Sequence, residues 1–327
     1  MIQLSVIIPT RNRAELLFNT LVSIENQMLD QSVFEVIVCD NNSSDNTSEV
    51  AHSFADKFQH FRYFKTLEPG LHIGRNKGFQ EAEGDILVYA DDDIITMQSW
   101  LEGVLDSFQD ESVVLVGGNN YPLYEVSPPA WVSKLWNESR NLDGYCIGYL
   151  SILDFGNEKK EISPYYVLGC NFSIRKNILS KFKGFHPDSM PDNLKKFRGD
   201  GESYISGEVN KFKLKTIFNP RASIFHFVPS ERMNLQYFYK RAFLNGISNS
   251  YRSIRQFKKM NRTIKFRNDL TYYKKNNKLK LKNMLKKITD IDAILEQGAL
   301  DGFRYHQLEV LKDNQLLEWV LKDNYLD

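Results

Sequence analysis

The sequence predicts an α/β fold built on a doubly wound sheet, with a C-terminal helical extension. Three segments near the start, at 4–9, 34–40 and 85–91, are rich in β-branched residues and almost continuously apolar, which is typical of strands covered on both faces. Between the first two, apolar residues recur at helical spacing from Leu17 to Met28. Strands that alternate with helices in this way favour a sheet with helices on both sides.

Beyond residue 40 the same patterns predict further elements. Val50, Phe54 and Phe58 recur at helical spacing, and the chain is predicted to be helical from Ser230 to its end. The stretch 121–163 is rich in Pro, Tyr and Trp without a clear period, so we expect a long excursion that lines a pocket. Strands are expected at 61–65, 113–116, 166–175 and 214–227, the last of them broken at Pro220.

The composition is that of a globular protein with a core to bury. Of the 327 residues, 42% are hydrophobic and 25% charged, which excludes wholesale disorder. No run approaches the roughly 18 to 20 apolar residues of a membrane span, and the start resembles a strand rather than a signal peptide. The three cysteines form neither a disulfide framework nor a metal-ligand spacing, so we expect a cytoplasmic protein.

Charge is strongly segregated although the net charge is only +1. The segment 252–287 contains 14 Lys and Arg against a single acid, Asp269, so the rest of the chain is acidic. A block of this kind predicts either a surface for an anionic partner, such as lipid or nucleic acid, or a solvated helical face.

Polar residues follow the three predicted strands. Residues 9–13 (PTRNR) come after the first strand, 40–42 (DNN) end the second, and 91–93 (DDD) end the third. Ligands of doubly wound sheets bind beyond the carboxyl ends of the strands, so we expect these residues to lie beside one another around a ligand. Neither a glycine fingerprint nor a phosphate loop follows the first strand, which disfavours a dehydrogenase or a P-loop enzyme.

The aspartates at the strand ends have two interpretations each. Asp40 can accept a hydrogen bond from a base or ribose, or it can form a turn that caps the next helix. Alternation along a strand would direct Asp91 and Asp93 to one side and Asp92 to the other. Such a pair of carboxylates suits a divalent cation that holds a diphosphate; the alternative is an acidic first turn of the following helix.

Four motifs in this order resemble the glycosyltransferases of family 2. They are PTRNR at 9–13, VCDNNSSD at 38–45, GRNKG at 74–78 and AEGDILVYADDD at 82–93. The resemblance implies the GT-A fold, which is Rossmann-like with a doubly wound mixed sheet. It also implies three parts: a nucleotide-sugar-binding half over 1–110, an acceptor-binding and catalytic half over 111–229, and a helical region over 230–327.

The resemblance assigns roles to individual residues. Asp40 would contact the nucleotide base, and Arg75 and Asn76 would lie beside the donor diphosphate and sugar. Asp91 and Asp93 match the family's DxD motif and would bind Mn2+ or Mg2+, with Asp93 the more direct ligand. Further donor-binding residues would be Pro9, Thr10, Arg11, Arg13, Asn42 and Asp92.

Two later segments carry the remaining expected site residues. In RGDGESYI at 198–205, Ile205 matches a leucine that follows the family's catalytic acid by three residues, which makes Glu202 the base. Asp200 is the competing choice. His226 resembles a family histidine that approaches the metal or diphosphate, although a lone histidine among phenylalanines is more often a core residue.

The resemblance implies single-displacement transfer with inversion at the anomeric carbon. The donor would be a nucleotide sugar, by family habit UDP-linked, and the acceptor a saccharide or lipid-linked saccharide in surface polysaccharide or glycan assembly. Residues 252–287 would then dock on the anionic inner face of the membrane as a peripheral contact, and nucleic acid is disfavoured because no nucleic-acid-binding signature is present. The alternatives are a catalytically silent GT-A-like binding module and, less favoured, a sugar nucleotidyltransferase.

Overall fold

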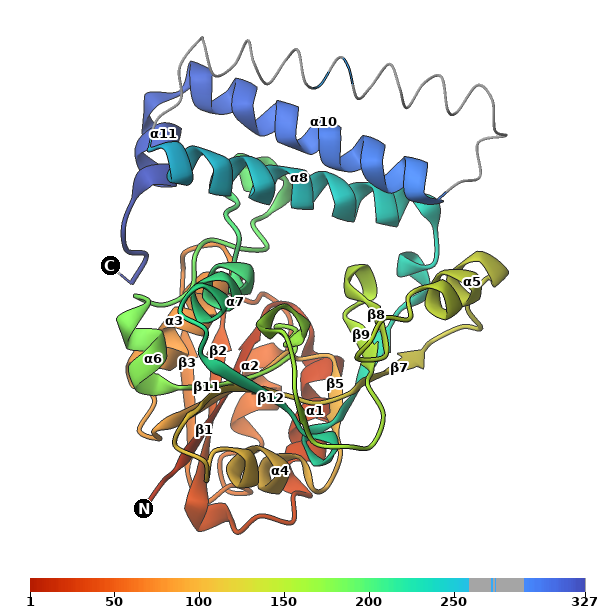
Figure 1. Cartoon of the computed structure of the whole chain (residues 1–327). Coiled ribbons are helices and arrows are strands. Elements are labelled where there is room, and N and C mark those ends of the chain that lie inside the picture. Colours follow the sequence, from red (N-terminus) through yellow and green to blue (C-terminus); the bar gives the residue numbers. More distant parts are fainter. Residues whose placement is uncertain (259–271, 273, 275–290, 327) are drawn as a thin grey trace. The chain divides into compact units, whose positions relative to one another are not determined.

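The computed structural model describes residues 1–258, 272, 274 and 291–326, which form two compact units (Figure 1). The first comprises Met1–Phe185, Gly201–Ser230 and the chain from Tyr325 onward; the second comprises His186–Asp200 and Glu231–Asn324. Most of the basic segment 252–287 lies outside the described residues.

The first unit contains an eight-stranded mixed sheet with strand order β10-β12-β6-β11-β4-β1-β2-β3. Strand β1 pairs in parallel with β2 and with β4, and β11 inserts antiparallel between β4 and β6. The expected α/β architecture is therefore confirmed. The strands are β1 (Leu4–Thr10), β2 (Phe34–Asp40), β3 (Phe61–Lys65), β4 (Ile86–Ala90), β6 (Val113–Gly117), β10 (Lys160–Glu161), β11 (Asn171–Arg175) and β12 (Lys215–Phe218).

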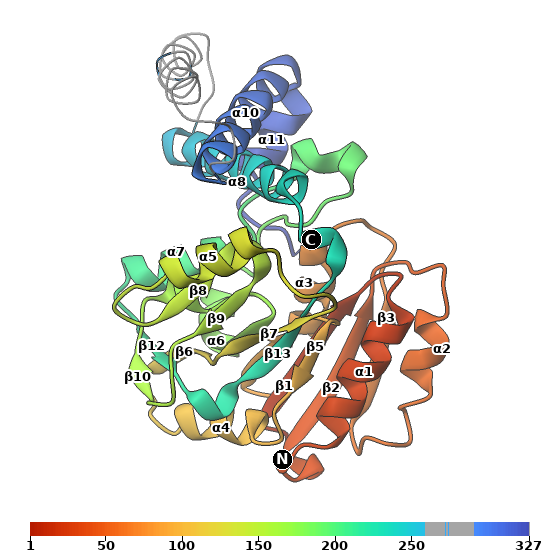
Figure 2. The same cartoon turned by 90° about the vertical axis from the view of Figure 1, so that its right-hand side faces the viewer.

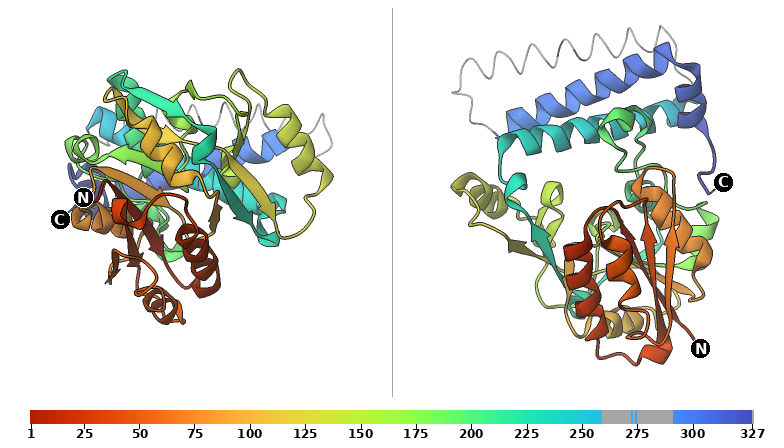
Figure 3. Two further views of the ribbon diagram at one scale, coloured as in Figure 1. Left: turned by 90° about the horizontal axis from the view of Figure 1, so that it is seen from below. Right: turned by 180° about the vertical axis from the view of Figure 1, so that it is seen from behind.

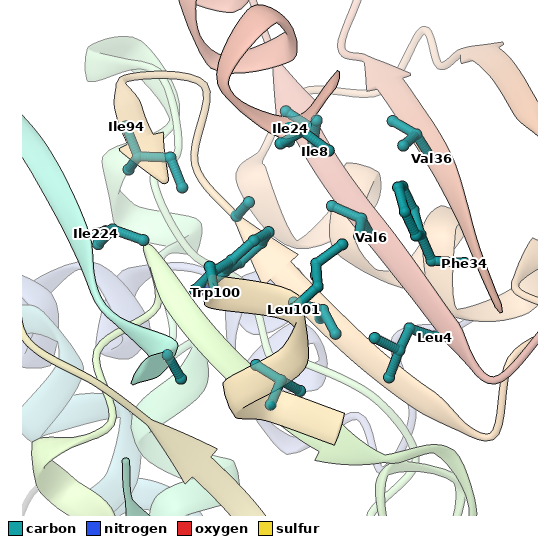
Figure 4. Packing of buried hydrophobic residues seen from close by; sticks show 14 of the residues in the cluster. Leu4, Val6, Ile8, Ile24, Phe34, Val36, Ile94, Trp100, Leu101 and Ile224 are labelled. Carbon is teal, nitrogen blue, oxygen red and sulfur yellow. The ribbon is translucent and has the colours of Figure 1, made fainter. Parts of the chain in front are cut away.

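Helices cover both faces of this sheet, as the apolar strands require. Leu4, Val6 and Ile8 of β1 pack against α1 and α4, whereas Ile7 packs toward α3, α6 and α7, which follows from the two-residue period of a strand (Figures 2 and 4). Helices α1 and α2 lie side by side in front of the β1–β3 strands (Figure 3, right). The helices are α1 (Ala14–Glu25), α2 (Thr47–His52), α3 (Leu71–Glu81), α4 (Trp100–Ser107), α5 (Ala130–Glu138), α6 (Lys176–Lys181) and α7 (Glu202–Lys211).

A second sheet stands where a long irregular excursion was expected. Its order is β5-β13-β7-β9-β8, and three of its strands lie within 121–163 or overlap it. These strands are short, and β7 pairs in parallel with β13, which lies about a hundred residues later in the sequence. The local sequence therefore contains no periodic pattern from which they could be predicted. The strands are β5 (Ile94–Thr96), β7 (Asn120–Tyr124), β8 (Tyr145–Ile147), β9 (Ile152–Asp154) and β13 (Ile224–Val228).

Two boundaries differ from the sequence expectation, and a third is confirmed. Helix α2 ends at His52, so Phe54 and Phe58 are buried in the turn that follows it rather than on a helix. Strand β11 begins at Asn171 instead of residue 166. The expected break at Pro220 is confirmed, because a short 3₁₀ turn at Pro220–Ala222 separates β12 from β13.

The second unit is helical, as expected of the C-terminal part. Its helices are α8 (Leu235–Phe257), α10 (Ile291–Lys312) and α11 (Asn314–Leu321), and α8 lies along α10 (Figure 1). The two pack closely because Gly246, Gly298 and Gly302 have no side chain: a Cβ at Gly302 would lie 1.8 Å from the Phe243 carbonyl oxygen. Within the described ranges, no helix is both long and apolar enough to cross a membrane.

Close packing of α3 on the sheet makes a testable prediction. A Cβ at Gly78 would lie 2.2 Å from Cγ2 of Ile7, so Gly78→Ala must push α3 away from β1. We expect it to lower the free energy of unfolding by about 1–3 kcal/mol, measured by urea denaturation. The control is Gly207→Ala in α7, where the nearest atom would be 3.7 Å away; there alanine should stabilise by roughly 0.5–1 kcal/mol. Equal effects at both positions would contradict this account of α3.

Candidate functional site

Polar residues at the ends of β1, β2 and β4 meet at one edge of the large sheet. Thr10, the last residue of β1, is in register with Asp40, the last residue of β2. The Thr10 hydroxyl donates a hydrogen bond of 2.7 Å to Oδ2 of Asp92, just beyond β4. The structure therefore brings the loop after β1 together with the aspartate triplet, as the parallel topology requires.

The triplet is arranged differently from the expected alternation. Strand β4 ends at Ala90, and the aspartates form the turn that leads into β5. Both Asp92 and Asp93 reach Nη1 of Arg13, at 2.8 and 2.9 Å, while Asp91 lies 3.4 Å from Arg75. The two-residue period of a strand fails here because the backbone has already left the strand.

Burial dominates the electrostatics of the middle aspartate. It raises the pKa of Asp92 to about 6 even though Arg13 beside it and the Thr10 hydroxyl act in the opposite direction. The neighbouring carboxylate of Asp93 adds to the rise. Arg13 is thus the cation that makes two adjacent buried carboxylates tolerable in this part of the protein.

Arg75 of α3 joins the strand end to a distant helix. Its buried guanidinium lies 3.0 Å from Oε2 of Glu202 and 3.4 Å from Oδ1 of Asp91, and it donates to the Gly169 carbonyl oxygen at 3.2 Å. Glu202 is the first residue of α7, and Gly201 before it has φ +51°, a conformation that glycine adopts easily. Of the two candidate bases, it is therefore Glu202 that lies next to Arg75.

The buried thiol of Cys170 is influenced by three carboxylates of the candidate site. Burial raises the pKa of Cys170 well above its usual value, and the charges of Asp91, Asp93 and Glu202 raise it further. All three carboxylates therefore lie within electrostatic range of the Cys170 thiol.

His226 of β13 approaches the triplet from the second sheet. Its Nε2 lies 3.5 Å from Oδ1 of Asp93, because His226 pairs with Ile94 across β13 and β5. Both side chains are 3% exposed, and Nδ1 of His226 is buried without a hydrogen-bond partner among the described residues. Such a buried imidazole beside a carboxylate has the chemistry of a metal ligand or a diphosphate contact.

The donor set suits a divalent cation only in part. Asp93 and His226 supply an oxygen and a nitrogen close together, and Mg2+ commonly takes one or two carboxylates and draws its other ligands from phosphates and water. Asp91 is held by Arg75 instead. No group of three or more His, Cys, Asp and Glu is placed to hold a metal ion within residues 1–258 or the other described positions.

Asp40 is fully buried and already engaged. Its Oδ1 accepts the backbone N–H of Ser43 at 2.8 Å, and its Oδ2 accepts the hydroxyl of Tyr63 at 2.6 Å. Burial, together with this bond, raises the pKa of Tyr63 to about 12. Asp40 therefore forms a turn contact with Ser43 but does not cap α2, which begins at Thr47. Sequence reasoning missed the contact with Tyr63, since only the β2–β3 register brings this residue to Asp40.

The other residues predicted for the site lie in loops, in β1, in α3 and in the second unit. Arg11 and Asn42 are exposed, and Pro9 lies buried in β1. Asn76 is buried in α3, where its amide binds the backbone of Phe185 and Tyr325. Asp200 belongs to the second unit and binds His186 at 2.8 Å and Arg252 at 3.3 Å.

The shared ion pair of Arg13 makes a prediction for stability. Arg13→Met leaves Asp92 and Asp93 without their common cation, so we expect the free energy of unfolding to fall by about 1–3 kcal/mol in thermal or urea denaturation. The neighbouring Arg11→Met removes an exposed arginine from the same loop and should change it by less than about 0.5 kcal/mol. A loss no greater for Arg13 than for Arg11 would show that the contact is not stabilising.

Comparison with known proteins gives consistent matches. The family model described as Glycosyl transferase family 2 matches residues 5–182. The glycosyltransferase AglE of Haloferax volcanii is 35% identical over 116 residues, covering 35% of this chain and 38% of AglE. The dolichol-phosphate mannosyltransferase of Pyrococcus furiosus is 29% identical over 219 residues, covering 63% of this chain and 60% of that protein. The matched region is thus less than two thirds of either relative.

Solved structures share the fold at low sequence identity. The mannosyltransferase PcManGT from Pyrobaculum calidifontis, in complex with GDP-Man and Mn2+, has a TM-score of 0.57 at 15% identity over 96% of this chain and 87% of its own. Residues 1–349 of S. aureus TarS in complex with UDP give 0.51 at 16% identity, over 95% and 92%. These likenesses show the GT-A fold. Since the family model spans more than half of the sequence, the chain belongs to glycosyl transferase family 2.

Proposed function

We propose that this protein is a metal-dependent inverting glycosyltransferase that moves a sugar from a nucleotide-sugar donor to an acceptor hydroxyl. The observation that carries the proposal is the double contact of Arg75, whose guanidinium holds Glu202 and Asp91 at one place. A carboxylate able to accept a proton and the acidic strand end thereby meet in the first unit. This is the pair of groups that displacement of a nucleoside diphosphate needs.

Glu202 is the proposed general base. In the transfer step the acceptor oxygen bonds to the anomeric carbon, the bond from that carbon to the diphosphate breaks, and the acceptor proton passes to Glu202. Its side chain is 29% exposed and so open to an acceptor, whereas that of Asp200 is 5% exposed and bound to His186 and Arg252. Accessibility and the Arg75 contact together favour Glu202 over Asp200.

Besides a base for the acceptor, the reaction requires neutralisation of the negative charge that develops on the leaving diphosphate. Arg13, paired with Asp92 and Asp93, and Arg75, paired with Asp91, place positive charge at the triplet, and preorganised charge of this kind stabilises a leaving group without reorganisation. Asp93 and His226 would hold a divalent cation, which when bound supplies Lewis acidity to the diphosphate. The presence of Mn2+ and GDP-Man in the related PcManGT structure supports this part of the proposal.

Donor and acceptor are proposed more broadly. A nucleoside diphosphate sugar would bind at the loops after β1 and β2. The UDP complex of TarS supports a uridine nucleotide, and the GDP-Man complex of PcManGT supports a guanosine nucleotide. The name of the Pyrococcus furiosus relative supports a lipid-linked acceptor or one in glycan assembly. With such an acceptor, the 14 basic residues of 252–287 would attract the chain to an anionic membrane surface.

Replacement of the base tests the assignment. Glu202→Gln should lower the rate of transfer by roughly 10²- to 10⁴-fold, because the amide cannot accept the acceptor proton, while calorimetry shows near-normal binding of the donor nucleotide. The paired control is Asp200→Asn, with folding checked by circular dichroism. If Asp200→Asn abolishes transfer and Glu202→Gln does not, the base is Asp200.

Removal of divalent cations tests the metal. EDTA should stop the release of nucleoside diphosphate from a nucleotide sugar, and excess Mn2+ or Mg2+ should restore it. Asp93→Asn should raise the Mn2+ concentration needed for half-maximal release, whereas Asp85→Asn, a change of an exposed residue just before the same strand β4, should not. Release that is insensitive to EDTA would contradict metal dependence. Release of pyrophosphate instead would indicate nucleotidyl transfer, and no release a silent binding module.

A further inference from the structure

Asn76 does not face an open donor site in this structure. Its side chain is buried, its Nδ2 donates to the carbonyl oxygens of Phe185 and Tyr325 at 3.0 and 3.2 Å, and its Oδ1 accepts the N–H of Phe185 at 2.8 Å. One amide thus binds both backbone groups of Phe185.

The ring of Phe185 in turn contacts Arg75. The Arg75 guanidinium carbon lies 5.4 Å from the centroid of the Phe185 ring, within the range of a cation–π interaction, and both side chains are almost wholly buried. Phe185 is itself held by edge-to-face contacts with Tyr89 at 4.9 Å and Phe172 at 5.8 Å. A planar guanidinium that rests on an aromatic face loses most of its freedom to rotate.

The contacts therefore form a chain that ends at the site. Asn76 fixes the backbone of Phe185, the Phe185 ring supports the guanidinium of Arg75, and Arg75 binds Glu202 and Asp91. The Phe185 ring thus supports the guanidinium in addition to its two ion pairs and its bond to the Gly169 carbonyl oxygen.

We propose that Phe185 and Asn76 are positioning residues for the reaction, which act through Arg75 on the placement of Glu202. This rests on the proposed function, in which Glu202 is the base. It replaces the sequence-based expectation that Asn76 contacts the donor. Neither residue would touch substrate. Both would instead raise the fraction of time in which the Glu202 carboxylate is oriented to accept the proton of the acceptor.

The activity test compares two buried phenylalanines of the same cluster. Phe185→Leu should lower kcat roughly tenfold and leave the donor KM within about twofold, because the base is misplaced while the donor loops are intact. The matched control is Phe218→Leu, a fully buried phenylalanine of the same apolar cluster whose ring packs against Phe155, and which should lose stability without losing kcat. Asn76→Ala should behave like Phe185→Leu; a raised donor KM with unchanged kcat would instead return Asn76 to donor binding and overturn the proposal.

A double-mutant cycle tests the contact without any assay of transfer. The drop in melting temperature caused by Phe185→Leu should be smaller in an Arg75→Met background than in the wild type, whereas the drop caused by Phe218→Leu should be the same in both. Additivity at Phe185, or equal kcat losses for the two leucine variants, would overturn the proposal. If the coupling is present but the wild-type protein transfers no sugar from any nucleotide sugar, the proposed function fails while the Phe185–Arg75 contact stands.

Discussion

The site depends on one buried guanidinium. Arg75 is 3% exposed, and a charge so far from water is tolerated only where it is paired and hydrogen-bonded. Glu202, Asp91 and the Gly169 carbonyl oxygen meet that requirement from three different parts of the chain. The same bonds that satisfy the arginine also hold two carboxylates near each other, so stability of the fold and geometry of the site are set by one interaction.

The backbone makes room for this arrangement. Helix α3 can bring Arg75 to the strand ends because Gly74 and Gly78 let it lie directly on β1: a Cβ at Gly74 would stand 3.0 Å from that of Pro9. Asn76 and Phe185 then fix the helix from its other side. In the short GRNKG motif, the two glycines allow close contact with the sheet, Arg75 brings a charge to the site, and the amide of Asn76 fixes the backbone beside it.

Local patterns predicted the large sheet well and the second sheet poorly. Strands at 34–40 and 61–65 have the expected bounds, because each carries its own apolar signal. The short strands of the second sheet are stabilised mainly by pairing with distant segments, and β7 with β13 is an example. The aspartate triplet shows the same limit, since its directions depend on where β4 stops and on the position of Arg13.

The sequence by itself determined which chemical groups stand at the strand ends, in what order, and that a family 2 glycosyltransferase domain is present. Only the tertiary structure decided which of them meet. Glu202 reaches Arg75 across 127 residues of sequence, and Asp200, two residues earlier, binds His186 and Arg252 instead. The spacing to Ile205 favoured Glu202 through the family resemblance, but the contact with Arg75 that separates the two acids is seen only in the fold. The physical reason is that a buried charge selects its partner by position in the folded chain, which spacing along the sequence does not encode.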